Sequence, residues 1–224
     1  MRLQAAVEKL LLFKGYGNPT GPYWFMGIEE YGQGTIEDVR TRAAFREIED
    51  LSLVHSCPPL GPVTGLIPTW GTMSKIVMRM NNNPDWPDTE TCRRYQTQRL
   101  GTADGETFLT ELLPLPKPSD MDFPKWWPWP SWEAYVKKVM PRRIAMIRAL
   151  FEEHQPLYVF CYGKGYWSYH KQIFPEADFR AIVGGKMEIA VLGTSRIVLT
   201  PFFAWFLMTN KLIGQMATEI ERPI

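Results

Sequence analysis

The sequence predicts a single α/β domain of three layers, with helices on both faces of a mostly parallel sheet of about four strands. Three observations support this prediction. Compact apolar runs have the length of buried strands and are followed by turn residues; they cover 23–28, 107–113, 157–162 and 196–200. Segments with helical spacing of apolar residues separate these runs. No repeat, linker or low-complexity tract divides residues 1–224, so we expect one domain.

The helices follow from local patterns, in chain order. A leading helix has apolar residues at Ala5, Val7, Leu10 and Leu11. The next helix begins after the Gly-rich turn behind the first strand, because Thr35 and Asp38 have the spacing of an N-terminal capping box. Further helices are expected over 72–81, 88–99, 131–152 and 204–221. Pro141 should kink or divide the 131–152 segment.

Charge gives only local hints of a partner. The net charge of +1 provides no overall basic field, so binding to nucleic acid would depend on local clusters. The best clusters are Lys137-Lys138 with Arg142-Arg143, and Arg93-Arg94 with Arg99. Each is either a phosphate contact or an ordinary solvated helix face.

The cysteines and the amino terminus indicate the compartment. The three cysteines are scattered and form no CxxC pair, which favours reduced thiols over disulfides or a structural zinc site; they are Cys57, Cys92 and Cys161. The apolar cluster Leu10–Phe13 is too short for a signal sequence or a membrane span. We therefore expect a cytoplasmic monomer with no membrane partner. No metal or other cofactor is expected.

Polar residues and glycines stand at the ends of the predicted strands. The first strand ends at Glu29 and Glu30, the second at Glu111, the third at Gly163–Gly165 and the fourth at Thr200. Open α/β sheets bind ligands beyond the carboxyl ends of their strands. The sequence therefore predicts one convergent site built from these ends.

In order, these strand ends resemble the motifs of the uracil-DNA glycosylase superfamily. The segment Gly27–Gly32 resembles its first motif, Gly-x-(Asp/Asn/Glu)-Pro-x-Gly. The resemblance implies that Glu29 positions or activates the attacking water and that Tyr31 stacks on the flipped base. The strand around Phe108 resembles the one that ends in a base-reading Asn. This similarity puts Glu111 in the reading position and Phe108 near the stacked base.

The remaining motifs match less closely. The strand 158–164 is similar to the penultimate strand of the family with its trailing glycine, and Thr200–Phe202 stands where His-Pro-Ser is common. Glu30 replaces the Pro, Glu111 the Asn and Thr200 the His. Without the His, one stabiliser of a departing base anion is missing, so we infer that plain uracil is not the preferred base. A carboxylate at Glu111 suits a base with an N–H donor, such as a cytosine-type N4 amine. With three cysteines, no iron–sulfur cluster is expected.

The resemblance implies a monofunctional DNA glycosylase, with DNA as its partner. It would hydrolyse the N-glycosidic bond of a flipped, modified pyrimidine (uracil or modified cytosine) and leave an abasic site, in base-excision repair or anti-phage defence. The catalytic candidates are Glu29, its electrostatic partner Glu30, and Thr200. The base-binding candidates are Gly27, Ile28, Tyr31, Gly32, Phe108, Glu111 and Phe202. The DNA-binding candidates are Gly34, Lys164, Arg142 and Arg143. No Lys occupies a motif position that suggests Schiff-base chemistry.

Alternative interpretations stay open. Glu29 and Glu30 fit a solvated acidic turn, Glu111 fits a buried partner of an Arg, and Thr200 fits a strand-end hydroxyl. The whole chain fits a catalytically inactive nucleic-acid-binding module of the same fold, or a nucleotide or nucleoside hydrolase. The Trp- and Pro-rich segment 125–132 fits either stacking indoles or a lid packed over the core.

Overall fold

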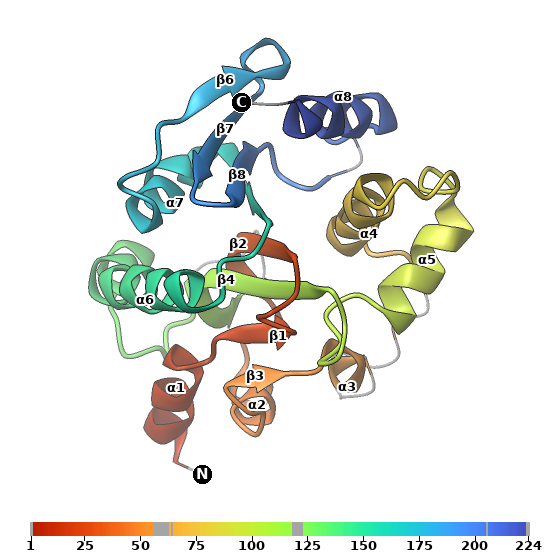
Figure 1. Ribbon diagram of the computed structural model, residues 1–224. Helices are drawn as coiled ribbons and strands as arrows, with labels where there is room; N and C mark the ends of the chain where they lie inside the picture. Colours follow the sequence, from red (N-terminus) through yellow and green to blue (C-terminus); the bar gives the residue numbers. More distant parts are fainter. Residues whose placement is uncertain (1, 56–62, 64, 118–122, 205, 223–224) are drawn as a thin grey trace.

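The structure is a computed structural model that describes residues 2–55, 63, 65–117, 123–204 and 206–222 (Figure 1). Within these residues the strands form one eight-stranded sheet in the order β3-β1-β4-β2-β5-β8-β7-β6. The predicted α/β class is therefore confirmed, whereas the expected strand number of about four is too low. Among the described residues, no helix is long and apolar enough to cross a membrane.

The four predicted strands form the centre of the sheet. They are β2 (Tyr23–Tyr31), β4 (Thr107–Lys117), β5 (Tyr158–Tyr162) and β8 (Ser195–Thr200). Neighbours in the series β4-β2-β5-β8 pair in parallel. Burial on both faces explains their unbroken apolar character: in β2, Trp24 and Met26 join one hydrophobic cluster, while Tyr23 and Phe25 join the other.

Four short strands extend the two edges. At one edge lie β1 (Gly15–Gly17), antiparallel to β4, and β3 (Ile48–Glu49), parallel to β1. At the other edge, β7 (Met187–Leu192) pairs antiparallel with β8, and β6 (Arg180–Ile182) pairs antiparallel with β7. These strands are the ones that the sequence reading missed.

Helices cover both faces, which gives the three predicted layers. One face carries α1 (Leu3–Leu11), α2 (Ile36–Arg42), α6 (Trp132–His154) and α7 (Trp167–Ile173). The other carries α3 (Leu51–Val54), α4 (Pro68–Met80), α5 (Thr89–Gln98) and α8 (Asn210–Glu221). Figure 1 shows α6 and α7 across the central strands from α4 and α8. Two 3₁₀ turns, η1 (Lys164–Tyr166) and η2 (Val183–Gly185), complete the fold.

Helix boundaries agree broadly with the sequence patterns. Thr35 caps α2 as expected, because its hydroxyl accepts from the Asp38 N–H. Pro141 does not divide its segment: α6 continues from Trp132 to His154 with Pro141 inside it. Pro141 is exposed, so the carbonyl that loses its helical partner there can be solvated.

The chain order of the central strands determines where a ligand can bind. From β2 the chain passes to β4 on one side and then, through α6, to β5 on the other side of β2. The connections thus reverse direction around β2, which is a topological switch point. The crevice beyond the carboxyl ends of β2, β4 and β5 is therefore where an open α/β sheet offers a site.

Candidate functional site

Three glutamates gather at the switch point. Glu29 and Glu30 end β2, and Glu111 lies on the adjacent strand β4, opposite Gly27. The pKa of Glu111 responds to the charges of both Glu30 and Glu29, which places the three carboxyl groups within electrostatic reach of one another. The structure thus brings together the acidic residues that the strand-end argument predicted.

Glu29 is held by two side chains from different elements. Its Oε1 accepts a hydrogen bond of 2.8 Å from the indole Nε1 of Trp132, at the start of α6. Its Oε2 lies 3.4 Å from Nζ of Lys117, at the end of β4. The Glu29 side chain is 17% exposed and that of Lys117 13%, so both remain partly accessible. The ring of Tyr166 packs edge-on against the ring of Trp132, whose N–H binds Glu29.

Glu30 belongs to a buried ion cluster, which we call the Arg42 cluster: Arg42, Asp38, Glu30 and Tyr16. The Arg42 guanidinium donates to Glu30 Oε1, to Asp38 Oδ1 at 2.8 Å and to the Tyr16 hydroxyl at 3.1 Å. It also donates to the Tyr31 carbonyl at 2.8 Å, so it fixes the backbone after Glu30. Burial alone would lower the pKa of Arg42, but Glu30, Tyr16 and Asp38 raise it above its ordinary value. Glu30 is thus paired with a guanidinium and Glu29 with a lysine and an indole N–H, and each glutamate side chain is 17% exposed.

Glu111 and Tyr162 form a second buried group, which we call the Glu111–Tyr162 pair. The Tyr162 hydroxyl donates to Glu111 Oε1 at 2.8 Å, while Glu111 Oε2 is closed off from solvent and has no hydrogen-bond partner. Burial, and next the charge of Glu30, raise the pKa of Glu111 well above its ordinary value. A side chain on Gly27 would overlap both Glu111 Oε2 and the Tyr162 hydroxyl, so this position requires glycine. The carboxyl group of Glu111 therefore holds its proton more tightly in the folded protein than a free glutamate does in water.

The alternative role of Glu111, as the partner of an arginine, is not observed. Arg143 lies nearby, but its guanidinium donates only to backbone carbonyls and to the sulfur of Met146. Its carbonyl partners are those of Phe13, Glu111 and Leu112. Burial lowers the pKa of Arg143 to about 10. Because its side chain is 1% exposed, the expectation that Arg143 contacts DNA is wrong.

Two further expected site residues lie in the interior. Phe108 is fully buried and its ring packs 4.9 Å from that of Trp24, so it belongs to the core and is not free to stack on a base. Thr200 is also fully buried, and its hydroxyl donates to the carbonyls of Pro201 and Cys161. This is the strand-end hydroxyl of the alternative interpretation, and no bond connects it to the glutamates.

Four other predicted residues lie at the surface of the protein. Tyr31 is 72% exposed and Phe202 46% exposed, with the Phe202 ring 5.9 Å from that of Tyr162. Arg142 and Lys164 are exposed, and Lys164 lies over the ring of Trp167. These four side chains are accessible to a large ligand.

The glycine turn after β2 is closely packed. A side chain on Gly32 would overlap Asp38 and Pro116, and the Gly34 carbonyl accepts from Trp126 Nε1 at 3.2 Å. Ile28 lies against Gly163, where a side chain would overlap it. These contacts hold the backbone between Glu29 and α2 in place.

The Trp-rich segment forms part of the packing over this edge. Trp127 is buried, and Trp126, Trp129 and Trp132 pack partly buried against the same hydrophobic cluster. Two of their indoles bond directly to the turn and to Glu29. The lid interpretation is therefore the one that the contacts favour.

The sequence reading did not assign Lys117, Trp132, Arg42 and Tyr16 to the site. The Asp38–Arg42 spacing of four residues on one helix was the available signal for a local ion pair. Lys117 had no such signal, because Pro114 and Pro116 suggested that the strand had already ended.

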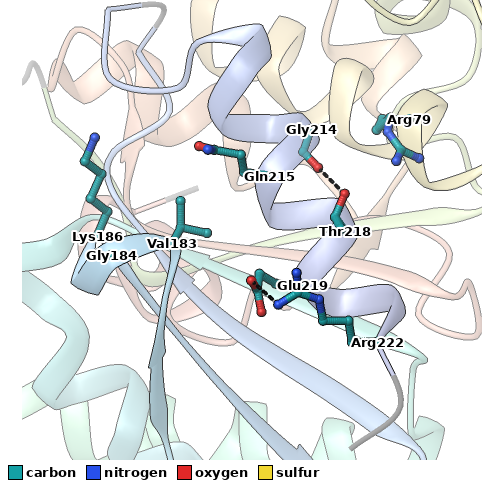
Figure 2. Close-up of a pocket in the computed structure, with 9 residues that line it drawn as sticks. All are labelled: Arg79, Val183, Gly184, Lys186, Gly214, Gln215, Thr218, Glu219 and Arg222. Carbon is teal, nitrogen blue, oxygen red and sulfur yellow. Dashed lines mark hydrogen bonds and ion pairs between the residues drawn. The ribbon is translucent and has the colours of Figure 1, made fainter.

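Two surface grooves lie outside the glutamate group. One, of about 730 Å³, runs between η2 and α8 (Figure 2). Its Arg222 pairs with Glu219 and its Arg79 with Glu221, so two of its cations are neutralised. The other, of about 860 Å³, lies between α6 and α7 and begins at Trp132, the residue that holds Glu29.

Comparison with known proteins does not assign this chain to a family. Neither the protein-family models nor the curated proteins give a match to this sequence. Within the described part of the chain, no group of three or more His, Cys, Asp or Glu side chains is arranged to hold a metal ion. Cys92 and Cys161 are buried free thiols, and Cys57 lies outside the described residues.

Proposed function

We propose that this chain is a uracil-DNA glycosylase-like enzyme, which hydrolyses the N-glycosidic bond of a pyrimidine nucleotide flipped out of DNA and leaves an abasic site. One observation carries the proposal: Glu29 and Glu30, in the last part of β2, interact electrostatically with Glu111 on the adjacent strand β4, at the switch point of an open α/β sheet. Cytoplasmic base-excision repair or anti-phage defence is the proposed setting.

The glutamates fit the charge that develops in this reaction. Breaking an N-glycosidic bond gives the sugar oxocarbenium character, which a nearby carboxylate stabilises. Glu29 is partly exposed and oriented by Trp132 and Lys117, so we assign it the orientation and deprotonation of water. Glu30 is fixed by Arg42 and contributes a preorganised negative charge behind Glu29.

The hydrogen-bonding groups of the Glu111 carboxyl determine which base this position would bind. Glu111 Oε2 is closed off from solvent and has no hydrogen-bond partner within the described residues, so a base reaches it only after the packing around Gly27 opens. The raised pKa favours the protonated carboxyl group, which carries an O–H donor as well as an acceptor oxygen. An ionised carboxylate would favour the N4 amine of a cytosine, whereas an O–H donor complements a carbonyl such as O4 of uracil. We therefore propose the uracil type of the two expected base classes.

Exposed rings at the same edge suit contact with an opened duplex. Tyr31 and Phe202 are accessible, and the loop that carries Phe202 continues to Phe206, which is 81% exposed. Aromatic side chains stack on extruded or single-stranded bases and fill the gap that a flipped base leaves. Lys164 and Arg142 remain the candidates for phosphate contact.

The decisive experiment measures abasic-site formation. Duplexes that carry uracil, 5-hydroxymethylcytosine or its glucosylated form are incubated with wild type, Glu29→Gln and the matched control Glu37→Gln, and are then cleaved with alkali. Glu37 is an exposed residue of α2. Excision of one base that Glu29→Gln loses and Glu37→Gln retains would support the proposal and identify the base.

The two alternative functions give different results in the same experiment. DNA binding with no excision across the panel would favour the inactive binding module. Failure to bind DNA even at low salt, with release of base from free nucleosides, would favour a nucleoside hydrolase.

A further inference from the structure

Lys117 is a lysine at the proposed reaction centre. It stands at the end of β4, opposite Tyr31 in the strand register, and its Nζ approaches Glu29 Oε2 to 3.4 Å. The pairing of β2 with β4 is irregular here: Glu29 lies opposite Leu113, but Tyr31, two residues later, lies opposite Lys117. With 13% exposure, the Lys117 side chain is sheltered but still accessible.

The proposed product is an electrophile for this amine. An abasic deoxyribose is in equilibrium with its ring-opened aldehyde, and a lysine beside a general base condenses with aldehydes to form a Schiff base. We propose that Lys117 forms a Schiff base with C1′ of the abasic site and gives the chain a strand-cleaving β-lyase activity. This inference rests on the proposed function for its substrate and revises the expectation of a monofunctional enzyme.

The steps balance without an oxidant or a reductant. Glu29 accepts a proton from the Lys117 ammonium and the free amine adds to the C1′ aldehyde. Glu29 then returns the proton to the hydroxyl group of the adduct, so that one water leaves and an iminium ion remains. A carboxylate then removes a proton from C2′, and the C3′–O bond breaks so that the 3′ phosphate departs with its strand. Water hydrolyses the iminium, which releases an unsaturated aldehyde and restores the amine of Lys117.

A purely structural role for Lys117 makes a different prediction. If its only task were to neutralise Glu29, an arginine would replace it, since Arg retains the positive charge. Arg cannot form a Schiff base. Lys211 is an exposed lysine of α8 outside the proposed site, so it serves as the control for chance reaction with a surface amine.

The test traps the Schiff base by reduction. A duplex with a preformed abasic site is mixed with the full chain and borohydride, and the covalent adduct is measured on a denaturing gel. We expect an adduct with wild type and with Lys211→Arg, and none above background with Lys117→Arg. Peptide mapping of the wild-type adduct by mass spectrometry should place the modification on Lys117, which keeps the test valid if a variant folds poorly.

The outcomes separate this inference from the proposed function. Because the abasic site is preformed, the adduct does not depend on base excision. Excision without an adduct would overturn the lyase and leave the glycosylase standing. An adduct at Lys117 with no excision of any base would leave the lyase standing and refute the glycosylase. Modification of Lys164 or of the amino terminus alone would overturn the role of Lys117.

Discussion

The Arg42 cluster and the Glu111–Tyr162 pair each hold a glutamate side chain of the central strands, the first with a guanidinium and the second with a phenol. The Glu30 side chain is 17% exposed, and Glu111 Oε2 is closed off from solvent. In the Arg42 cluster, Glu30 meets a guanidinium that also binds Asp38 and Tyr16. In the other group, Glu111 meets only a phenol, because the nearby Arg143 is occupied with backbone carbonyls.

This difference determines which charges the site carries. A buried carboxylate stays ionised when a fixed cation pairs with it, and it takes up a proton when burial is not compensated. Glu30 keeps a cation beside it, whereas burial raises the pKa of Glu111 well above its ordinary value. Two glutamates on neighbouring strands thus occupy one site with a cation and one site without.

Removing the Arg42 guanidinium should break the Arg42 cluster and cause the largest decrease in the free energy of unfolding among these predictions. In Arg42→Met, the carboxylates of Asp38 and Glu30 lose their guanidinium, and the Tyr31 carbonyl loses its donor. Stranding a buried charge lowers the free energy of unfolding by about 3–5 kcal/mol. Urea unfolding checks this value, with Arg40→Met on the exposed face of α2 as the control. Equal stability of the two variants would contradict a buried ion cluster.

A methyl group at Gly27 should disturb the neutral pair by a smaller amount. In Gly27→Ala the new Cβ would overlap Glu111 Oε2 and the Tyr162 hydroxyl, so the pair must separate. Overpacking of this kind lowers the free energy of unfolding by about 1–3 kcal/mol. Thermal unfolding of Gly27→Ala beside Gly165→Ala, where a Cβ has open space, measures the effect. A stable Gly27→Ala protein would show that Glu111 is not packed against β2.

The protonation of Glu111 predicts a specific pH dependence. Its pKa in the folded protein lies well above the ordinary 4.5, so the folded state holds the proton more tightly than the unfolded chain. The stability due to this group is complete below the ordinary pKa and is lost as pH rises toward the folded pKa. Glu111→Gln cannot titrate, so its stability relative to wild type should rise by about 1.4 kcal/mol per pH unit in that window.

Urea unfolding of wild type and Glu111→Gln across neutral pH checks this slope. Glu152→Gln, an exposed position on α6, is the control and should show no such trend. A pH-independent difference between wild type and Glu111→Gln would mean that Glu111 is ionised, as the sequence reading had assumed for its role toward a cytosine-type amine.

The central strands were predictable because a strand buried on both faces consists almost entirely of apolar residues. A strand covered on both faces is a continuous apolar run, as in Tyr158–Tyr162, and it needs no partner to be recognised. The edge strands β1 and β3 have three and two residues, too few for a period to emerge. The β7–β8 hairpin did carry a signal, a two-residue turn with Gly193 at a φ of 60°, which a hairpin search would find.

The candidate site was predictable only as far as each strand end. Glu29 and Glu30 follow from the rule that parallel strands end at one edge, whereas Glu111 lies inside β4, which continues to Lys117. Their partners do not, since Trp132 and Arg42 come from separate helices and reach the site through tertiary packing. Arg143 shows the converse: it stands in a basic sequence cluster, yet α6 turns it inward to three backbone carbonyls.

The smallest change in stability should accompany a clear change in activity. Trp132→Phe keeps a ring beside Tyr166 but removes the N–H that holds Glu29 Oε1. Because this bond is only partly buried, its loss should lower the free energy of unfolding by about 1 kcal/mol. If Glu29 acts on the water, loss of its orientation should lower kcat about tenfold or more with little change in KM, since a misplaced base affects the transition state most. Trp129→Phe, in the same segment but against Tyr135, should leave kcat unchanged. Equal kcat values for the two variants would mean that Trp132 only packs and that Glu29 is positioned by Lys117 alone.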